Sequence, residues 1–272
     1  MTSFRDASSL ERLARGRFRA SADASWAQGR GLYGGLVAAL LARALEAEAP
    51  SGQRIARMTV CFTAPFAAGA AMLSVSTVRT ARNVSCMRAE IANEGADAPA
   101  ASCLATLARP RPSAALVHHG LVPPPVPAPD EVPDGPGELY FPAFASRFEF
   151  RQCLGPRPFS GGAQARVGGW CRSREGAPFD PALVVALLDA WSPAAVGVSP
   201  GWCPVASLEM TVHFLVPLPH TRASGWLLYD ASCDHAEGGL ADERAVIFDQ
   251  HGTPLATAQQ LVALLPGAER PT

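Results

Sequence analysis

Residues 36–44 read LVAALLARA, and residues 183–191 read LVVALLDAW. Two further pairs of similar segments follow in the same order. They are MTVCFTAPF and MTVHFLVPL at residues 58–66 and 210–218, then PAASCLATLA and PLATAQQLVA at residues 99–108 and 254–263. The offset between the copies grows slowly, from 147 to 152 to 155 residues, which indicates short insertions in the second copy. The pattern predicts an internal duplication.

Length and composition agree with a duplicated globular protein. The chain has 272 residues, which suits two halves of about 130 residues each. Its hydrophobic content of 48% and charged content of 17% are typical of a well-cored protein and exclude a disordered one. The formal net charge of −1 gives no electrostatic reason to expect nucleic acid as a partner.

Neither a targeting signal nor a membrane span is expected. The first 18 residues, MTSFRDASSLERLARGRF, mix acids with bases and lack an apolar signal core. The longest apolar stretch, Leu36 to Leu45, is interrupted by Arg43 and is too short to cross a bilayer. These features predict a cytoplasmic protein without a membrane partner.

The cysteines argue for reduced thiols. There are seven, an odd number, and none forms a C-x-x-C pair. This pattern disfavours a disulfide framework or a structural zinc site and fits buried thiols in the cytoplasm. We find no metal-ligand spacing elsewhere, so we expect neither a metal nor another cofactor.

A proline-rich stretch separates the two copies. Residues 109–137 hold nine prolines, and proline fixes φ and removes a backbone donor. Such a stretch is neither a central strand nor a helix interior, and it is typical of an extended connector. We therefore predict an N-terminal unit over residues 1–109, a linker over 110–137 and a C-terminal unit over 138–272.

Each unit is predicted to contain one buried helix followed by an antiparallel sheet, which is an α+β architecture. The helices are expected from Gly34 to about Glu48 and from Pro181 to about Trp191, with Asp180 as the N-cap of the second. In the strand around residues 207–214, Leu208, Met210, Val212 and Phe214 alternate with Ser207, Glu209, Thr211 and His213. The other expected strands are 55–62, 70–78, 84–92 and 100–108, then 225–233, 242–249 and 255–264, with a further strand before each helix near 17–26 and 146–154.

Five motifs in this order resemble the double-hotdog acyl-CoA thioesterases, the thioesterase II family. They are Tyr33-Gly34-Gly35, Phe62-Thr63-Ala64-Pro65, Thr80 to Ser85, Ala206 to Glu209 followed by Phe214 and Pro217, and Leu255 to Gln260. The resemblance spans nearly the whole chain except the linker. It implies two antiparallel sheets, each wrapped around a central helix, that form a pseudo-dimer. It leaves both a monomer and a homo-oligomer open.

The resemblance also implies an acyl-CoA substrate and a water held by an Asp, a Ser or Thr, and a Gln. Carried over by position, these fall on Asp189, Ser207 and Gln260. Where the family often has Asp-His, this chain has Glu209-Met210, and it lacks the family's His-Arg-Pro run. These departures leave the acyl-chain and CoA specificity unpredicted.

The duplication supports the same residues independently. At the repeat offsets, Ser207 corresponds to Ile55 and Gln260 to Ala105, so the polar groups occur in one copy only. A buried polar group without a partner costs about 1–3 kcal/mol, which suggests that chemistry retains them. Asp189 would act as general base toward water, with Ser207 and Gln260 fixing its position.

The oxyanion is expected at a helix N-terminus, where free N–H groups favour negative charge. Gly34 and Gly35 are the candidates, because the absence of Cβ lets a carbonyl approach the backbone. Structural interpretations stay open at this point. Asp189 could be an exposed surface acid, Ser207 could bond to the backbone, and Gln259 could point inward instead of Gln260.

Rival functions are weaker on the sequence. A serine-nucleophile hydrolase would need a G-x-S-x-G elbow, which is absent. His213 and His235 could serve a nucleophile, but their spacing does not select them. A hotdog dehydratase or hydratase would need a histidine and a carboxylate in one cleft. A non-catalytic acyl-binding protein and a carrier-protein-directed thioesterase remain as further alternatives.

Overall fold

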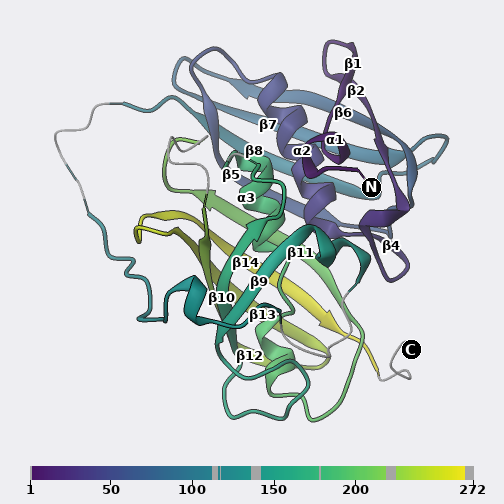
Figure 1. The fold of residues 1–272 in the computed structure, drawn as a ribbon. Helices are drawn as coiled ribbons and strands as arrows, with labels where there is room; N and C mark the ends of the chain where they lie inside the picture. Colours follow the sequence, from purple (N-terminus) through teal and green to yellow (C-terminus); the bar gives the residue numbers. More distant parts are fainter. Residues whose placement is uncertain are drawn as a thin grey trace.

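The computed structural model describes residues 2–111, 116, 118–135, 142–177, 179–218 and 225–266. Figure 1 shows a sheet that curves around two central helices. The N-terminal elements are α1 (Phe4–Ala7), β1 (Glu11–Ala14), β2 (Arg17–Ala22), β3 (Ala27–Gln28), β4 (Gly31–Leu32), α2 (Gly34–Ala47), β5 (Arg54–Phe62), β6 (Gly69–Thr80), β7 (Val84–Asn93) and β8 (Ala101–Ala108).

The C-terminal elements repeat much of this order. They are β9 (Phe148–Leu154), β10 (Arg166–Ser173), α3 (Pro181–Leu188), β11 (Val205–Phe214), β12 (Leu227–Glu237), β13 (Leu240–Asp249) and β14 (Pro254–Leu264). Four short 3-10 turns, η1 to η4, cover Ala24–Trp26, Pro129–Glu131, Ala143–Arg147 and Ala194–Gly197.

Twelve strands form one antiparallel sheet in the order β1-β2-β6-β7-β8-β5-β11-β14-β13-β12-β10-β9. Read outward from the centre, the two halves have their strands in the same order. The strands β5, β8, β7, β6, β2 and β1 of the first half correspond to β11, β14, β13, β12, β10 and β9 of the second. The halves meet where β5 pairs with β11, and Thr59 lies opposite Thr211, its equivalent at the repeat offset of 152. The two threonine hydroxyls are 2.9 Å apart. The two separate sheets expected from the resemblance are thus joined edge to edge into one.

The core lies on the inner face of this sheet, around α2 and α3. All eight residues of α3 are buried, as are most residues of α2. The helices also pack against each other, which explains why α3 is apolar on every side. None of the helices in the described ranges combines the length and the apolar character that crossing a membrane requires.

One predicted helix boundary was wrong, and one strand was not predicted. Helix α3 ends at Leu188 instead of continuing to about Trp191, and Asp189 is its C-cap. Pro193 lies just beyond, and the residue before a proline disfavours helical geometry. Strand β10 was not predicted, because Gly168 and Gly169 weaken its strand pattern. These glycines allow close pairing with β12 and β9.

Residues 126–132 of the linker lie against the outer face of the C-terminal half of the sheet. Trp170 Nε1 donates to the carbonyl of Pro127 at 2.8 Å, and Arg151 donates to that of Val132 at 2.7 Å. Val132 is buried there among apolar residues that form a cluster separate from the main core: Trp170, Trp226, Leu228 and Phe248. This part of the linker is therefore docked on the sheet.

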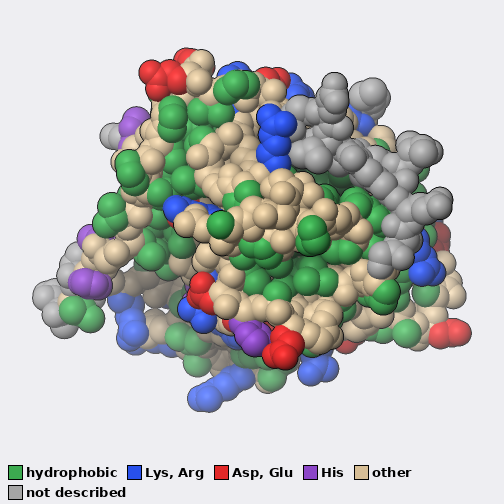
Figure 2. Space-filling model, turned by 90° about the horizontal axis from the view of Figure 1, so that it is seen from below, with side chains coloured by type: hydrophobic (Ala, Val, Ile, Leu, Met, Phe, Trp, Pro, Cys, Tyr) green, Lys and Arg blue, Asp and Glu red, His purple; other side chains and the backbone are tan. Residues whose placement is uncertain are grey.

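On the face drawn in Figure 2, basic and acidic side chains are scattered among hydrophobic and neutral ones. The described side chains of this face form no continuous basic surface of the kind that binds a phosphate backbone.

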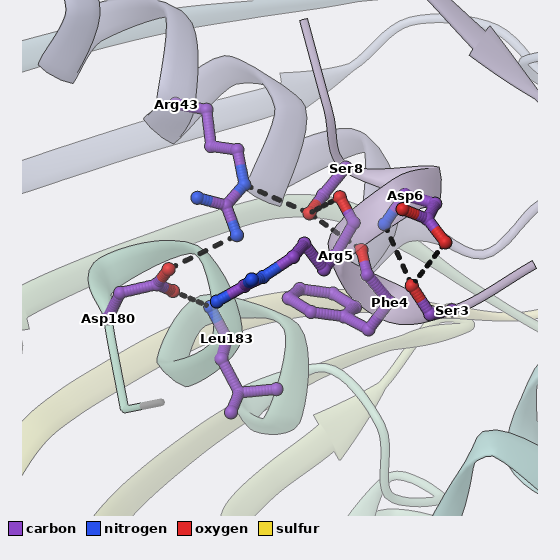
Figure 3. A network of polar contacts seen from close by, with 8 residues as sticks. All are labelled: Ser3, Phe4, Arg5, Asp6, Ser8, Arg43, Asp180 and Leu183. Carbon is purple, nitrogen blue, oxygen red and sulfur yellow. Dashed lines mark hydrogen bonds and ion pairs between the residues drawn. The ribbon is translucent and has the colours of Figure 1, made fainter. Parts of the chain in front are cut away.

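The N-terminus of α3 is tied to both N-terminal helices, as Figure 3 shows. Asp180 caps α3 by accepting the Leu183 N–H at 2.8 Å, and it forms an ion pair with Arg43 of α2 at 3.1 Å. Arg43 Nε donates to the hydroxyl of Ser8 at 2.9 Å, and Ser8 donates to the carbonyl of Phe4 in α1. The N-terminus of α3 is thus held by hydrogen bonds and an ion pair within the protein.

We predict that Asp180→Ala lowers the free energy of unfolding by about 1 kcal/mol, mainly because the N-cap is lost. The ion pair adds little, since both side chains are partly exposed to solvent. Urea denaturation followed by circular dichroism measures the change. Asp234→Ala is the control, because Asp234 is exposed and its 3.9 Å pair with Arg244 is weak. Equal stability of both variants would contradict the role of the cap.

Candidate active site

The structure brings Asp189, Ser207 and Gln260 together. Ser207 Oγ donates to Asp189 Oδ1 at 3.0 Å, and Gln260 Nε2 donates to the same oxygen at 2.7 Å. Gln260 Nε2 also lies within hydrogen-bond distance of Ser207 Oγ. Asp189 and Gln260 are only 8% and 6% exposed. The three side chains therefore form one polar cluster on the inner face of the sheet, in which Asp189 and Gln260 are buried and Ser207 is partly buried.

A β-bulge places Ser207 in this cluster. The pairing of β11 with β14 shifts between Ser207 and Glu209, so Leu208 is the extra residue. Strict alternation would put Leu208 on the inner face, together with Met210, and would put Ser207 on the outer face. The bulge reverses this, and Leu208 is 37% exposed. The sequence pattern alone grouped Ser207 with the outward residues.

The choice between the two neighbouring glutamines is settled by the sheet. Gln260 lies opposite Met210 on the inner face. Gln259 is exposed on the other face, where its amide donates to Asp242 at 3.0 Å. Gln260 is therefore the inward residue of the pair.

Gly34 and Gly35 bring the first helix to the same cluster. They begin α2, and the side chain of Tyr33 at the N-cap makes no capping hydrogen bond to the helix. A Cβ on Gly34 would lie 2.8 Å from Asp189 Oδ2, and one on Gly35 would lie 2.8 Å from the carbonyl oxygen of Ala186. The Gly35 N–H also lies near enough to the Asp189 carboxylate to lower its pKa. The site is thus composite, with the helix N-terminus from one half and the carboxylate from the other.

Burial raises the pKa of Asp189 to about 6, while hydrogen bonds from Gln260, Ser207 and the Gly35 N–H act in the opposite direction. The carboxylate is therefore largely ionised at neutral pH and is a stronger base than an ordinary aspartate. Its two oxygens offer about four acceptor positions, and these three donors leave room for the O–H of a water. The arrangement can accept a proton from a water placed beside the N-terminus of α2.

Tyr33 and Glu243 also lie near Asp189, and neither was predicted as a site residue. Tyr33 is fully buried, its hydroxyl donates to the carbonyl of Ala186, and its ring stacks on Phe144 with centroids 3.9 Å apart. Glu243 is 4% exposed on the inner face of β13. Its inward direction was readable from the alternation of Ala241, Ala245 and Ile247 on the same strand.

The histidines considered from the sequence lie elsewhere. His213 is on the exposed outer face of β11, and the His235 side chain is 74% exposed. Among the described residues, no histidine hydrogen-bonds to Asp189, and no three His, Cys, Asp or Glu side chains could together hold a metal ion.

Comparison with known proteins identifies relatives of the chain. Residues 22–108 match the family model described as the acyl-CoA thioesterase N-terminal domain. Residues 123–264 match the model of the acyl-CoA thioesterase C-terminal domain. No curated protein matches the chain.

Several solved structures share the fold. A conserved protein of unknown function with a hotdog fold from Alicyclobacillus acidocaldarius is 25% identical, with a TM-score of 0.88 over 97% of this chain and 98% of that one. The tesB protein of Mycobacterium avium subspecies paratuberculosis is 21% identical, with a TM-score of 0.78 over 97% and 98%. An acyl-CoA thioesterase II, TesB2, from Mycobacterium marinum is 21% identical, with a TM-score of 0.77 over 98% and 100%.

The expected hotdog fold is confirmed by these structures. Because the two domain models match in order and the C-terminal match alone covers more than half of the residues, the chain belongs to the acyl-CoA thioesterase family.

Proposed function

We propose that the protein hydrolyses acyl-CoA thioesters to the free acid and CoA by means of a water activated by Asp189. The observation that carries this proposal is the convergence of Ser207 and Gln260 on one oxygen of Asp189, beside the N-terminus of α2. Membership of the thioesterase family supports the reaction class.

In this mechanism Asp189 accepts a proton from the water as the water oxygen bonds to the thioester carbonyl carbon. Ser207 and Gln260 hold the carboxylate in one orientation, which keeps the reacting atoms aligned. The carbonyl π electrons move to oxygen, and the N–H groups at the start of α2 stabilise the resulting oxyanion. When the intermediate collapses, the C–S bond breaks, and Asp189 returns the proton to the departing thiolate.

We also propose that residues 1–109 and 138–272 are two hotdog units of an internal pseudo-dimer, joined by the linker at 110–137. The matching strand order on either side of the β5–β11 pair supports this arrangement. The composite site would then require both units, since Gly34 and Asp189 lie in different ones.

Thiol release from a panel of acyl-CoAs, measured with Ellman's reagent, tests the reaction. Release of CoA in proportion to free acid is expected. Binding without thiol release would instead indicate an acyl-binding protein, and hydration of an enoyl-CoA without thiol release would indicate a hydratase. Turnover of acyl-carrier protein in preference to every acyl-CoA would favour the carrier-protein-directed alternative.

We predict that Asp189→Asn lowers kcat by about 10²–10⁴-fold, because the amide cannot accept the proton of the water. The variant should fold, since asparagine is isosteric and removes a buried charge. Asp249→Asn is a matched control, because Asp249 is also buried and accepts hydrogen bonds from the backbone of His251 and Thr253. Wild-type turnover by a folded Asp189→Asn protein would refute the assignment of the base.

Gly34→Ala is expected to reduce kcat by about tenfold or more, because the new Cβ would displace the carboxylate of Asp189. Helix formation should not suffer, since alanine is favoured over glycine in helices. Gly201→Ala serves as the control, because its Cβ would meet no atom within 4 Å. If the two variants have the same kcat, the close approach at Gly34 has no bearing on catalysis.

The pH dependence of kcat follows from the raised pKa of Asp189. Only the ionised carboxylate can act as base, so kcat should rise with pH and level off above about 6. A series of buffers at constant ionic strength measures this limb. A midpoint near the ordinary aspartate value of about 4 would contradict the buried-base mechanism.

A further inference from the structure

Glu243 is a buried carboxylate that the mechanism above does not use. It lies on the inner face of β13, and in the sheet it pairs directly with Gln260 of β14. A buried carboxylate is costly unless it is well hydrogen-bonded. Its presence beside a proposed site residue therefore needs a reason.

The duplication shows that packing alone does not require this acid. Gln260 corresponds to Ala105 in the first half, and the sheet partner of Ala105 is Met87. The pair Met87 and Ala105 thus occupies the place that Glu243 and Gln260 occupy in the second half. Met87 is 2% exposed, so the fold accepts an apolar side chain at this position.

The carboxylate of Glu243 holds the segment that follows Asp189. It accepts the backbone N–H of Ala194 and, at 3.1 Å, the hydroxyl of Tyr229. The Tyr229 ring stacks on Trp191, with centroids 5.4 Å apart and an interplanar angle of 3°. Trp191 and Ala194 are two and five residues after Asp189, so Glu243 fixes this segment directly and through Tyr229.

This anchor matters because Asp189 is the C-cap of α3, so the α-helix itself does not continue past it. The direction of its side chain then depends on the path of the chain just beyond. A segment held at Trp191 and Ala194 leaves Asp189 little freedom to turn away from Ser207 and Gln260.

We propose that Glu243 is a positioning residue for thioester hydrolysis, which keeps the Asp189 carboxylate aligned with its hydrogen-bond donors. The inference rests on the proposed role of Asp189 as base. Glu243 would be the fourth polar residue that the second half contributes to the site. It would act by holding the segment that follows Asp189.

The charges around Glu243 agree with this role. Burial raises the pKa of Glu243 to about 7, hydrogen bonds from Ala194 and Tyr229 lower it, and the charge of Asp189 raises it. Tyr229 and Cys233 are the other titratable groups that interact with its charge. The negative charge of Asp189 therefore disfavours ionisation of Glu243.

The test replaces Glu243 by its first-half counterpart. Glu243→Met removes both hydrogen bonds and should lower kcat by about tenfold or more, with KM changed less than about twofold. Glu243→Gln keeps an acceptor oxygen and should restore kcat to within about threefold of wild type. Met87→Ala is the matched control, since it disturbs the equivalent site in the other half without touching the segment after Asp189.

The acidic limb of the kcat profile provides a readout that a purely structural role would not change. The donors to Asp189 lower its pKa, so a carboxylate that drifts away from them has a higher pKa. Glu243→Met should therefore move the limb to higher pH, while Met87→Ala leaves it in place. If Glu243→Met does not fold, Tyr229→Phe decides, because loss of the hydroxyl alone should shift the limb in the same direction.

Wild-type kcat and an unshifted limb in Glu243→Met, or equal changes in Met87→Ala, would overturn the inference. Asp189→Asn, assayed alongside, separates the two proposals. An inactive Asp189→Asn with a fully active Glu243→Met removes only the role of Glu243. A fully active Asp189→Asn removes the role of Asp189 itself.

Discussion

The N-terminus of α2 and the C-terminal end of α3 touch each other through backbone, and the site depends on this contact. A side chain at Gly35 would collide with the carbonyl of Ala186, and one at Gly34 with the carboxylate of Asp189. Only glycine lets the two helices approach this closely. Because each helix comes from a different half, neither half could form this arrangement of N–H groups and carboxylate alone.

Burial of Asp189 has two effects: it destabilises the charged carboxylate, and it makes that carboxylate a stronger base. Removing a carboxylate from water destabilises its charged form, which is why its pKa rises to about 6. The donors Ser207, Gln260 and Gly35 limit this rise, so the group remains charged at neutral pH yet basic enough to take a proton. A fully solvated aspartate would be ionised but a weaker base, and a buried one without these donors would have a still higher pKa.

Much of this could be predicted from the sequence, for reasons that are local. The repeat gave the two helices and their following strands, because apolar periodicity survives duplication. Gln260 was readable as a polar residue in an apolar strand with Ala105 as its counterpart. The placement of Ser207 was not readable, because it depends on a bulge at Leu208 that a period of two cannot show. The joining of β5 to β11 was missed as well, since non-local strand pairing leaves no mark on either strand's pattern.

The two halves differ at the N-termini of their central helices, α2 and α3. This difference explains why we place the proposed reaction at the start of α2. At α3, Asp180 occupies the Leu183 N–H and pairs with Arg43, so the N-terminus is satisfied within the fold. At α2, Tyr33 offers no such cap, and its hydroxyl is directed to α3 instead. The Gly34 and Gly35 N–H groups at the start of α2 are thus left to Asp189 and to whatever binds beside it. A capped helix start favours stability, whereas an uncapped one next to a buried base favours a developing negative charge.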